Sequence, residues 1–101
     1  MAEKKIVLLC CAGMSTSMLV EKMKTVAASQ KKDYYIKADT MNVADQLVPG
    51  SDVVLIGPQI RYATKKLQSQ FPGIPFVDIP MQMYGLMDGK KVLELAEKNM
   101  K

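Results

Sequence analysis

This chain of 101 residues contains no histidine and no tryptophan, and Arg61 is its only arginine. The absence of histidine excludes acid–base catalysis and metal binding by imidazole. A helix that crosses a bilayer needs about 20 apolar residues, and no apolar run of this chain approaches that length. The N-terminus also lacks the cleavage pattern of a signal peptide. We therefore expect a cytoplasmic protein whose chemistry depends on other side chains.

Cysteine is also scarce, since Cys10 and Cys11 are the only two and are neighbours in the sequence. Adjacent cysteines rarely form a structural disulfide, and a reducing compartment keeps them as thiols. Their spacing matches no zinc-binding pattern. We predict neither a bound metal nor a cofactor.

Positive charge is in modest excess, because 14 basic residues outnumber 10 acidic residues and give a net charge of +4. Almost all of the excess is lysine, and aromatic residues make up only 6%. Nucleic-acid-binding surfaces usually combine arginine with aromatic side chains, so the composition disfavours a nucleic-acid partner. Solvated lysines at the ends of helices and strands are the simpler interpretation.

Strand and helix patterns alternate along a chain that suits one globular domain over residues 1–101. Hydrophobic residues make up 49% and charged residues 24%, as in soluble proteins. Apolar runs predict strands over 4–10, 33–40, 53–56 and 75–79. Helical spacing predicts helices over 16–30, 43–48, 60–71 and 88–100, with Ser15, Asn42 and Asp88 as N-caps and a loop over 80–87.

This alternation predicts an α/β fold with a parallel sheet, because strand–helix–strand crossovers are right-handed and place helices on both faces. We expect four strands in the order 2-1-3-4, a flavodoxin-like three-layer sandwich. Ligands of such sheets bind beyond the carboxyl ends of the strands. The loop at Cys10, the turn 57–59 and the segment 79–87 are then expected on one edge.

The segment that begins at Cys10 has the composition of an anion-binding loop. A thiol placed between a strand and a helix N-terminus meets backbone N–H groups that favour a thiolate and can cradle a phosphate. Gly13 lets the backbone approach an anion closely. We predict Cys10 as the nucleophile and the next seven residues as phosphate ligands: Cys11, Ala12, Gly13, Met14, Ser15, Thr16 and Ser17.

The loop resembles the phosphatase-like P-loop of low-molecular-weight tyrosine phosphatases, whose pattern is C-x5-R-[ST]. Thr16 stands at the arginine position, so the guanidinium that clamps phosphoryl oxygens is missing. No Asp-Pro pair supplies an obvious general acid. The loop is therefore better suited to accept and hold a phosphoryl group than to hydrolyse its ester.

The whole chain resembles the enzyme IIB component of the sugar phosphotransferase system, lactose/cellobiose family. Three stretches carry the resemblance: residues 10–17, residues 57–62 (Gly-Pro-Gln-Ile-Arg-Tyr) and residues 83–89 (Met-Tyr-Gly-Leu-Met-Asp-Gly). The resemblance implies that an enzyme IIA phosphohistidine donates to Cys10. S-phosphocysteine then passes the group to a sugar, such as cellobiose or another β-linked oligosaccharide, in the membrane component IIC.

Three further residues are expected to support this site. Gln59 would bind the phosphoryl group or order the loop, or is simply a turn residue. Arg61 would steer a phosphate-bearing partner, or is a solvated helix residue. Tyr84 would close over the site or pack on a partner, or packs at the sheet edge. We expect a monomer that meets IIC transiently at the inner face of the membrane.

Three other interpretations stay open. A low-molecular-weight phosphatase or arsenate reductase relative would hydrolyse p-nitrophenyl phosphate. A flavodoxin-like binding module without enzymatic activity would tolerate Cys10→Ser. A redox protein would cycle a disulfide between Cys10 and Cys11.

Overall fold

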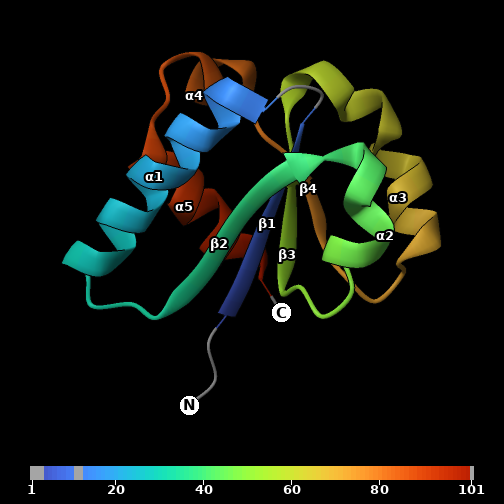
Figure 1. Cartoon of the computed structure of the whole chain (residues 1–101), viewed down its shortest axis with the longest axis horizontal. Coiled ribbons are helices and arrows are strands. Elements are labelled where there is room, and N and C mark those ends of the chain that lie inside the picture. Colours follow the sequence, from blue (N-terminus) through green and yellow to red (C-terminus); the bar gives the residue numbers. More distant parts are fainter. Residues whose placement is uncertain (1–3, 11–12, 101) are drawn as a thin grey trace.

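A four-stranded parallel sheet forms the centre of the molecule (Figure 1). The computed structural model describes residues 4–10 and 13–100. The predicted strand order is confirmed, and so are the bounds of the first and third strands. The strands are β1 (Lys4–Cys10), β2 (Tyr34–Thr40), β3 (Val53–Ile56) and β4 (Phe76–Asp78), in the order β2-β1-β3-β4.

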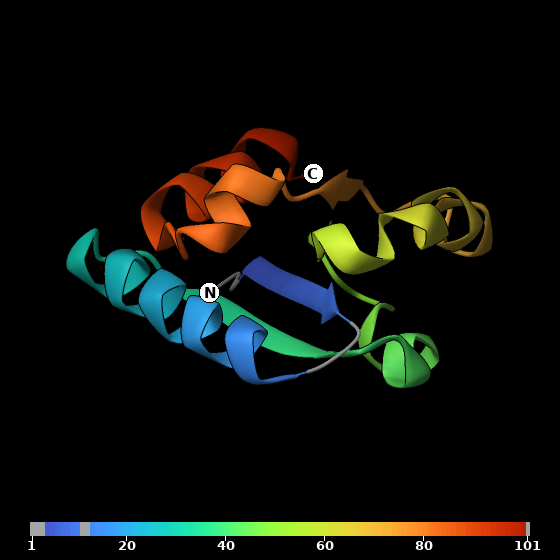
Figure 2. The ribbon, with the colours of Figure 1, turned by 90° about the horizontal axis from the view of Figure 1, so that it is seen from above.

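Helices cover both faces of the sheet and complete the predicted three layers (Figure 2). One face carries α1 (Gly13–Ser29), α4 (Met81–Gly85) and α5 (Gly89–Asn99), and the other carries α2 (Ala44–Leu47) and α3 (Thr64–Gln70). Within the described residues, no helix combines the length and the apolar character that crossing a membrane requires.

The core consists of two clusters separated by the sheet. Because side chains alternate across a strand, Ile6 and Leu8 of β1 join the cluster under α1 and α5. Val7 and Leu9 join the cluster under α2 and α3. Both faces of β1 are therefore buried, which explains its continuous apolar run.

The first helix begins earlier than its sequence pattern indicates. α1 begins at Gly13 rather than at residue 16, so Ser15 lies in its first turn and the prediction of Ser15 as N-cap was wrong. Leu19 of this helix belongs to the core cluster, and the apolar periodicity begins at this residue. The sequence pattern therefore marks the part of the helix that packs on the core and not the residue at which the helix begins.

The helices on the other face also begin differently from the prediction. Residues 41–43 form a 3₁₀ turn before α2, so Asn42 lies inside this turn and is not an N-cap. The 3₁₀ segment η2 (Pro58–Ala63) precedes α3. Pro58 presets the φ angle that starts this turn. Ile60, buried in the second core cluster, has non-helical angles (φ −123°, ψ 21°) that separate η2 into two parts.

The segment 80–87, predicted as a loop, contains the short helix α4. Five residues are too few to show a helical pattern in the sequence. Pro80 precedes the helix with φ −58°, and its carbonyl accepts the Tyr84 amide at 3.1 Å. Asp88 then caps α5 as predicted, since its carboxylate accepts the Lys91 amide at 3.1 Å.

A hydrogen-bonded cluster joins α5 to the amino end of β2. The Tyr34 hydroxyl donates to the Glu97 carboxylate at 2.6 Å, and the Lys32 ammonium pairs with the same oxygen. Burial by itself raises the pKa of Glu97, but the hydrogen bonds from Lys32 and Tyr34 outweigh burial and lower it. Burial, the hydrogen bond to Glu97 and its negative charge raise the pKa of Tyr34 to about 12.

Candidate active site at the carboxyl edge of the sheet

The carboxyl ends of all four strands meet at one edge, drawn at the top of Figure 1. Cys10 is the last residue of β1 and pairs with Thr40, the last residue of β2. On the other side, Leu9 pairs with Ile56, the last residue of β3. The predicted nucleophile therefore lies between its two neighbouring strands at the edge where α/β proteins bind ligands.

The Cys10 side chain is buried, with only 1% of its surface exposed. Its thiol donates a long hydrogen bond to the Asp39 carbonyl oxygen, with Sγ and the oxygen 3.8 Å apart. The Asp39 carboxylate in turn accepts the Thr40 amide at 2.8 Å. Asp39 was not predicted from the sequence. The strand register provides the signal, because Asp39 pairs with Leu9 beside Cys10.

The helix that follows Cys10 presents its N-terminus to this edge. α1 begins at Gly13 and has no acidic residue in its first turn, so its N-terminal N–H groups favour an anion. In a helix that begins at Gly13, the Ser17 amide bonds within the helix. Ser17 is exposed on α1, and its role as a phosphate ligand stays a prediction.

The other predicted phosphate ligands are described only in part or not at all. Cys11 and Ala12 fall outside the described residues. Gly13, Met14, Ser15 and Thr16 belong to the helix backbone, while their side chains fall outside the described part. Their roles stay predictions.

Gln59 is brought to the nucleophile by the turn after β3. Gly57 is buried, and its amide donates to the Leu9 carbonyl at 2.9 Å, which holds the turn against the end of β1. Gln59 is exposed in η2, and its Oε1 lies 3.2 Å from the point that a Cβ on Gly57 would occupy, while the Cβ of Cys10 lies 3.6 Å from the same point. The turn therefore brings Gln59 to the edge where Cys10 lies, and its role at the phosphoryl group stays a prediction.

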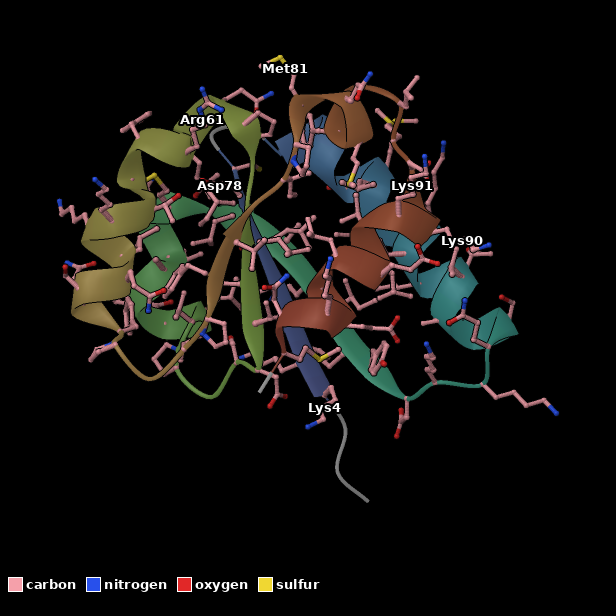
Figure 3. All side chains as sticks on the ribbon, turned by 180° about the vertical axis from the view of Figure 1, so that it is seen from behind. Lys4, Arg61, Asp78, Met81, Lys90 and Lys91 are labelled. Carbon is pink, nitrogen blue, oxygen red and sulfur yellow. The ribbon has the colours of Figure 1, made fainter. Side chains whose placement is uncertain are left out.

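Arg61 lies farther out on η2 and is exposed. Figure 3 shows it at the same edge as Met81, with Asp78 nearby. The Asp78 carboxylate accepts the Thr64 hydroxyl, which holds the start of α3 against the end of β4. Arg61 thus lies at the edge where Cys10 lies, on η2 and not in the loop that follows Cys10.

Tyr84 is half-buried in α4 and packs against the core cluster under α1 and α5. This position agrees with the simpler alternative, packing at the edge of the sheet. The structure gives no separate support for a Tyr84 side chain that closes over Cys10.

Exposed apolar side chains occur on the segments that follow β1, β3 and β4 at this edge. We call four of them the apolar rim: one lies in α1, one in η2, one in α4 and one directly after α4. Tyr35, on β2, is the other large hydrophobic side chain that is exposed in the described part of the chain. The members of the apolar rim and their exposed fractions are Met18 (56%), Tyr62 (79%), Met81 (71%) and Leu86 (75%). Such a patch is typical of a protein–protein contact surface.

The fold and the site define a class of protein: a small α/β domain with a cysteine between its first parallel strand and a helix N-terminus. The model of the family described as "PTS system, Lactose/Cellobiose specific IIB subunit" matches residues 5–95. The chain belongs to this family, so it is the IIB component of a sugar phosphotransferase system and a phosphotransferase.

Individual relatives agree with this assignment. Two proteins are each 43% identical over 99% of both chains: the galactose-specific EIIB component of Lactococcus lactis subsp. cremoris and the cellobiose-specific EIIB component of Lactococcus lactis subsp. lactis. The solution structure of the cellobiose-specific IIB component from Borrelia burgdorferi is 39% identical. It superposes with a TM-score of 0.80 and covers 96% of this chain and 91% of that chain.

Proposed function

We propose that Cys10 accepts a phosphoryl group from a phosphohistidine of enzyme IIA and passes it to a sugar bound by the membrane component IIC. The observation that carries the proposal is the position of Cys10, at the end of β1 and just before the N-terminus of α1. The chain has no histidine that would accept the group instead.

Both transfers are displacements at phosphorus. In the first, the Cys10 sulfur forms the S–P bond while the P–N bond of the donor breaks. The departing imidazole keeps the electron pair and takes the thiol proton. In the second, a sugar hydroxyl forms the O–P bond, the S–P bond breaks, and the sulfur recovers a proton. Such transfers need positioning and charge stabilisation more than new covalent chemistry.

The charges around Cys10 favour carrying over hydrolysis. The N-terminal N–H groups of α1 stabilise an anion. The only guanidinium, that of Arg61, stands on η2 rather than in the loop. A phosphatase that lacks a clamping arginine stabilises its transition state poorly. The low-molecular-weight phosphatase stays the alternative, and turnover of p-nitrophenyl phosphate would support it.

The contact between Cys10 and Asp39 must break when the phosphoryl group arrives. A thiolate or a phosphothioester has no S–H to donate, so the Asp39 carbonyl loses this donor. Phosphorylation should therefore perturb the end of β2 as well as the loop. The change is measurable as amide chemical-shift differences at Asp39 and Thr40.

The apolar rim suits the docking of the two partners. A donor and an acceptor must both reach the same sulfur, so each is expected to cover the same carboxyl edge. Large apolar side chains around a reactive centre exclude water when a partner binds. We propose that IIA and IIC use this edge in turn, and that the carrier itself is a monomer.

The sugar we propose is cellobiose or another β-linked oligosaccharide. A relative of each kind, galactose-specific and cellobiose-specific, is equally similar to this chain. Selection therefore depends chiefly on IIC. Membranes that contain the cognate IIC should phosphorylate cellobiose faster than galactose or lactose when this chain carries the phosphoryl group.

The carrier proposal is tested by intact-protein mass after incubation with phosphoenolpyruvate, the general phosphotransferase proteins and IIA. Wild type and Cys11→Ser should each gain one phosphoryl group, and Cys10→Ser should gain none. Addition to Cys10→Ser, or no addition to any variant with several IIA donors, would overturn the proposal. A mass that corresponds to a disulfide between Cys10 and Cys11, without a phosphoryl adduct, would favour the redox interpretation.

A further inference from the structure

Gly57 has a backbone conformation that does not require glycine. Its angles are φ −62° and ψ 147°, which L-residues adopt readily when they precede proline. It is also fully buried between the end of β1 and the start of η2. The reason for glycine at this position must therefore be space rather than conformational freedom.

The space beside Gly57 is shared by the two side chains on which the site depends. A Cβ at position 57 would lie 3.2 Å from Gln59 Oε1, 3.3 Å from the Leu9 carbonyl oxygen and 3.6 Å from Cys10 Cβ. The first two distances are shorter than ordinary van der Waals contacts. The missing side chain therefore leaves a niche that is bordered by the Gln59 carboxamide oxygen, the Leu9 carbonyl oxygen and the Cβ of Cys10.

We propose that Gly57 is a positioning residue: it leaves room for the Gln59 carboxamide oxygen, so that the NH₂ group of the same carboxamide is held where it donates a hydrogen bond to the phosphoryl group on Cys10 Sγ. This inference rests on the proposed carrier function and names the geometry on which the transfer depends.

The backbone around the niche leaves little room for adjustment. The Gly57 amide donates to the Leu9 carbonyl at 2.9 Å, and the Ile60 amide donates to the Gly57 carbonyl at 3.0 Å. These bonds fix Gly57 on both sides, one to β1 and one to η2. A methyl group at position 57 would displace the exposed Gln59 side chain first, because the buried strand end has more contacts to lose.

Gly57→Ala should therefore slow phosphoryl transfer while the protein stays folded. Loss of one hydrogen bond to a charged group corresponds to a decrease of about tenfold in kcat. KM for IIA should stay within about twofold, because the niche lies under the turn rather than on the apolar rim. Gln59→Ala should cause a similar decrease.

The double variant distinguishes positioning from a general disturbance. If Gly57 acts through Gln59, then Gly57→Ala with Gln59→Ala should be no slower than the slower single variant. Gly73→Ala is the matched control, since Gly73 is exposed in the turn before β4 and a Cβ there meets no atom within 4 Å. It should transfer at the wild-type rate.

The test combines rapid-quench phosphorylation by IIA with NMR of the Gln59 side-chain amide. Gly57→Ala should shift that resonance and the Cys10 amide, and Gly73→Ala should shift neither. An unshifted Gln59 resonance, wild-type kcat in Gly57→Ala, or multiplicative effects in the double variant would each overturn the inference. If wild type accepts no phosphoryl group, the carrier function fails, and the NMR result still decides whether the niche positions Gln59.

Discussion

Helix α5 approaches α1 closely at Gly89, the first residue of α5, and this contact makes a quantitative prediction. A Cβ at position 89 would lie 2.7 Å from Lys22 Cβ, 2.9 Å from the Lys22 carbonyl carbon and 3.0 Å from the Met23 amide nitrogen. Two of these three atoms belong to the α1 backbone. A rotamer change cannot relieve such contacts, so Gly89→Ala must move α5 away from α1.

The size of the effect follows from this displacement. Restoring an ordinary contact of 3.4 Å requires a shift of about 0.7 Å. That shift loosens Val92 and Leu93, which pack with Leu19 in the core cluster under α1 and α5. Overpacking of this kind costs about 1–3 kcal/mol, and the better helix propensity of alanine returns up to about 1 kcal/mol. We expect a net loss of about 2 kcal/mol, or roughly 10 °C in Tm.

Urea unfolding followed by circular dichroism measures this loss, because the chain has no tryptophan to report by fluorescence. Gly85→Ala is the matched control: it lies in a helix, and a Cβ there meets no atom within 4 Å. Its stability should equal or slightly exceed that of wild type. Gly89→Ala with a free energy of unfolding within about 0.5 kcal/mol of wild type would refute the packing argument.

Three further predictions concern the far edge, the apolar rim and a helix cap. Tyr34→Phe removes a donor to Glu97 and should cost about 1–2 kcal/mol at neutral pH. The lowered pKa of Glu97 stabilises the fold above the ordinary value of 4.5, so acid titration should erase this difference as the pH falls below it. Leu86→Ser should raise KM for IIA severalfold with Tm unchanged, whereas Tyr35→Ser, on β2, should leave KM unaltered in steady-state assays. Asp88→Ala removes the cap of α5 and should cost about 1 kcal/mol in urea unfolding.

The sheet could be predicted from the sequence because its strands are short, continuous apolar runs separated by helical patterns. β1 and β3, buried on both faces, show this pattern most clearly, and their bounds agree with the prediction. Of the helix starts, that of α5 was predicted from its cap Asp88, whereas those of α1 and α2 were not. Ser15 and Asn42 have the composition of N-caps, yet the path of the chain places both inside a turn. α4 is too short for any periodicity to reveal.

The candidate site, like the fold, could be predicted from the sequence only in part. The sequence by itself determined which residue is the candidate nucleophile, because Cys10 ends an apolar strand, precedes a helix and has no histidine to compete with it. Only the tertiary structure decided which groups touch that thiol. The Asp39 carbonyl accepts the Cys10 thiol from β2, 29 residues away, and η2 brings Gln59 Oε1 to the same side of Gly57 as Cys10 Cβ. Such contacts depend on strand register and on the space left by Gly57, and neither is visible in a local pattern.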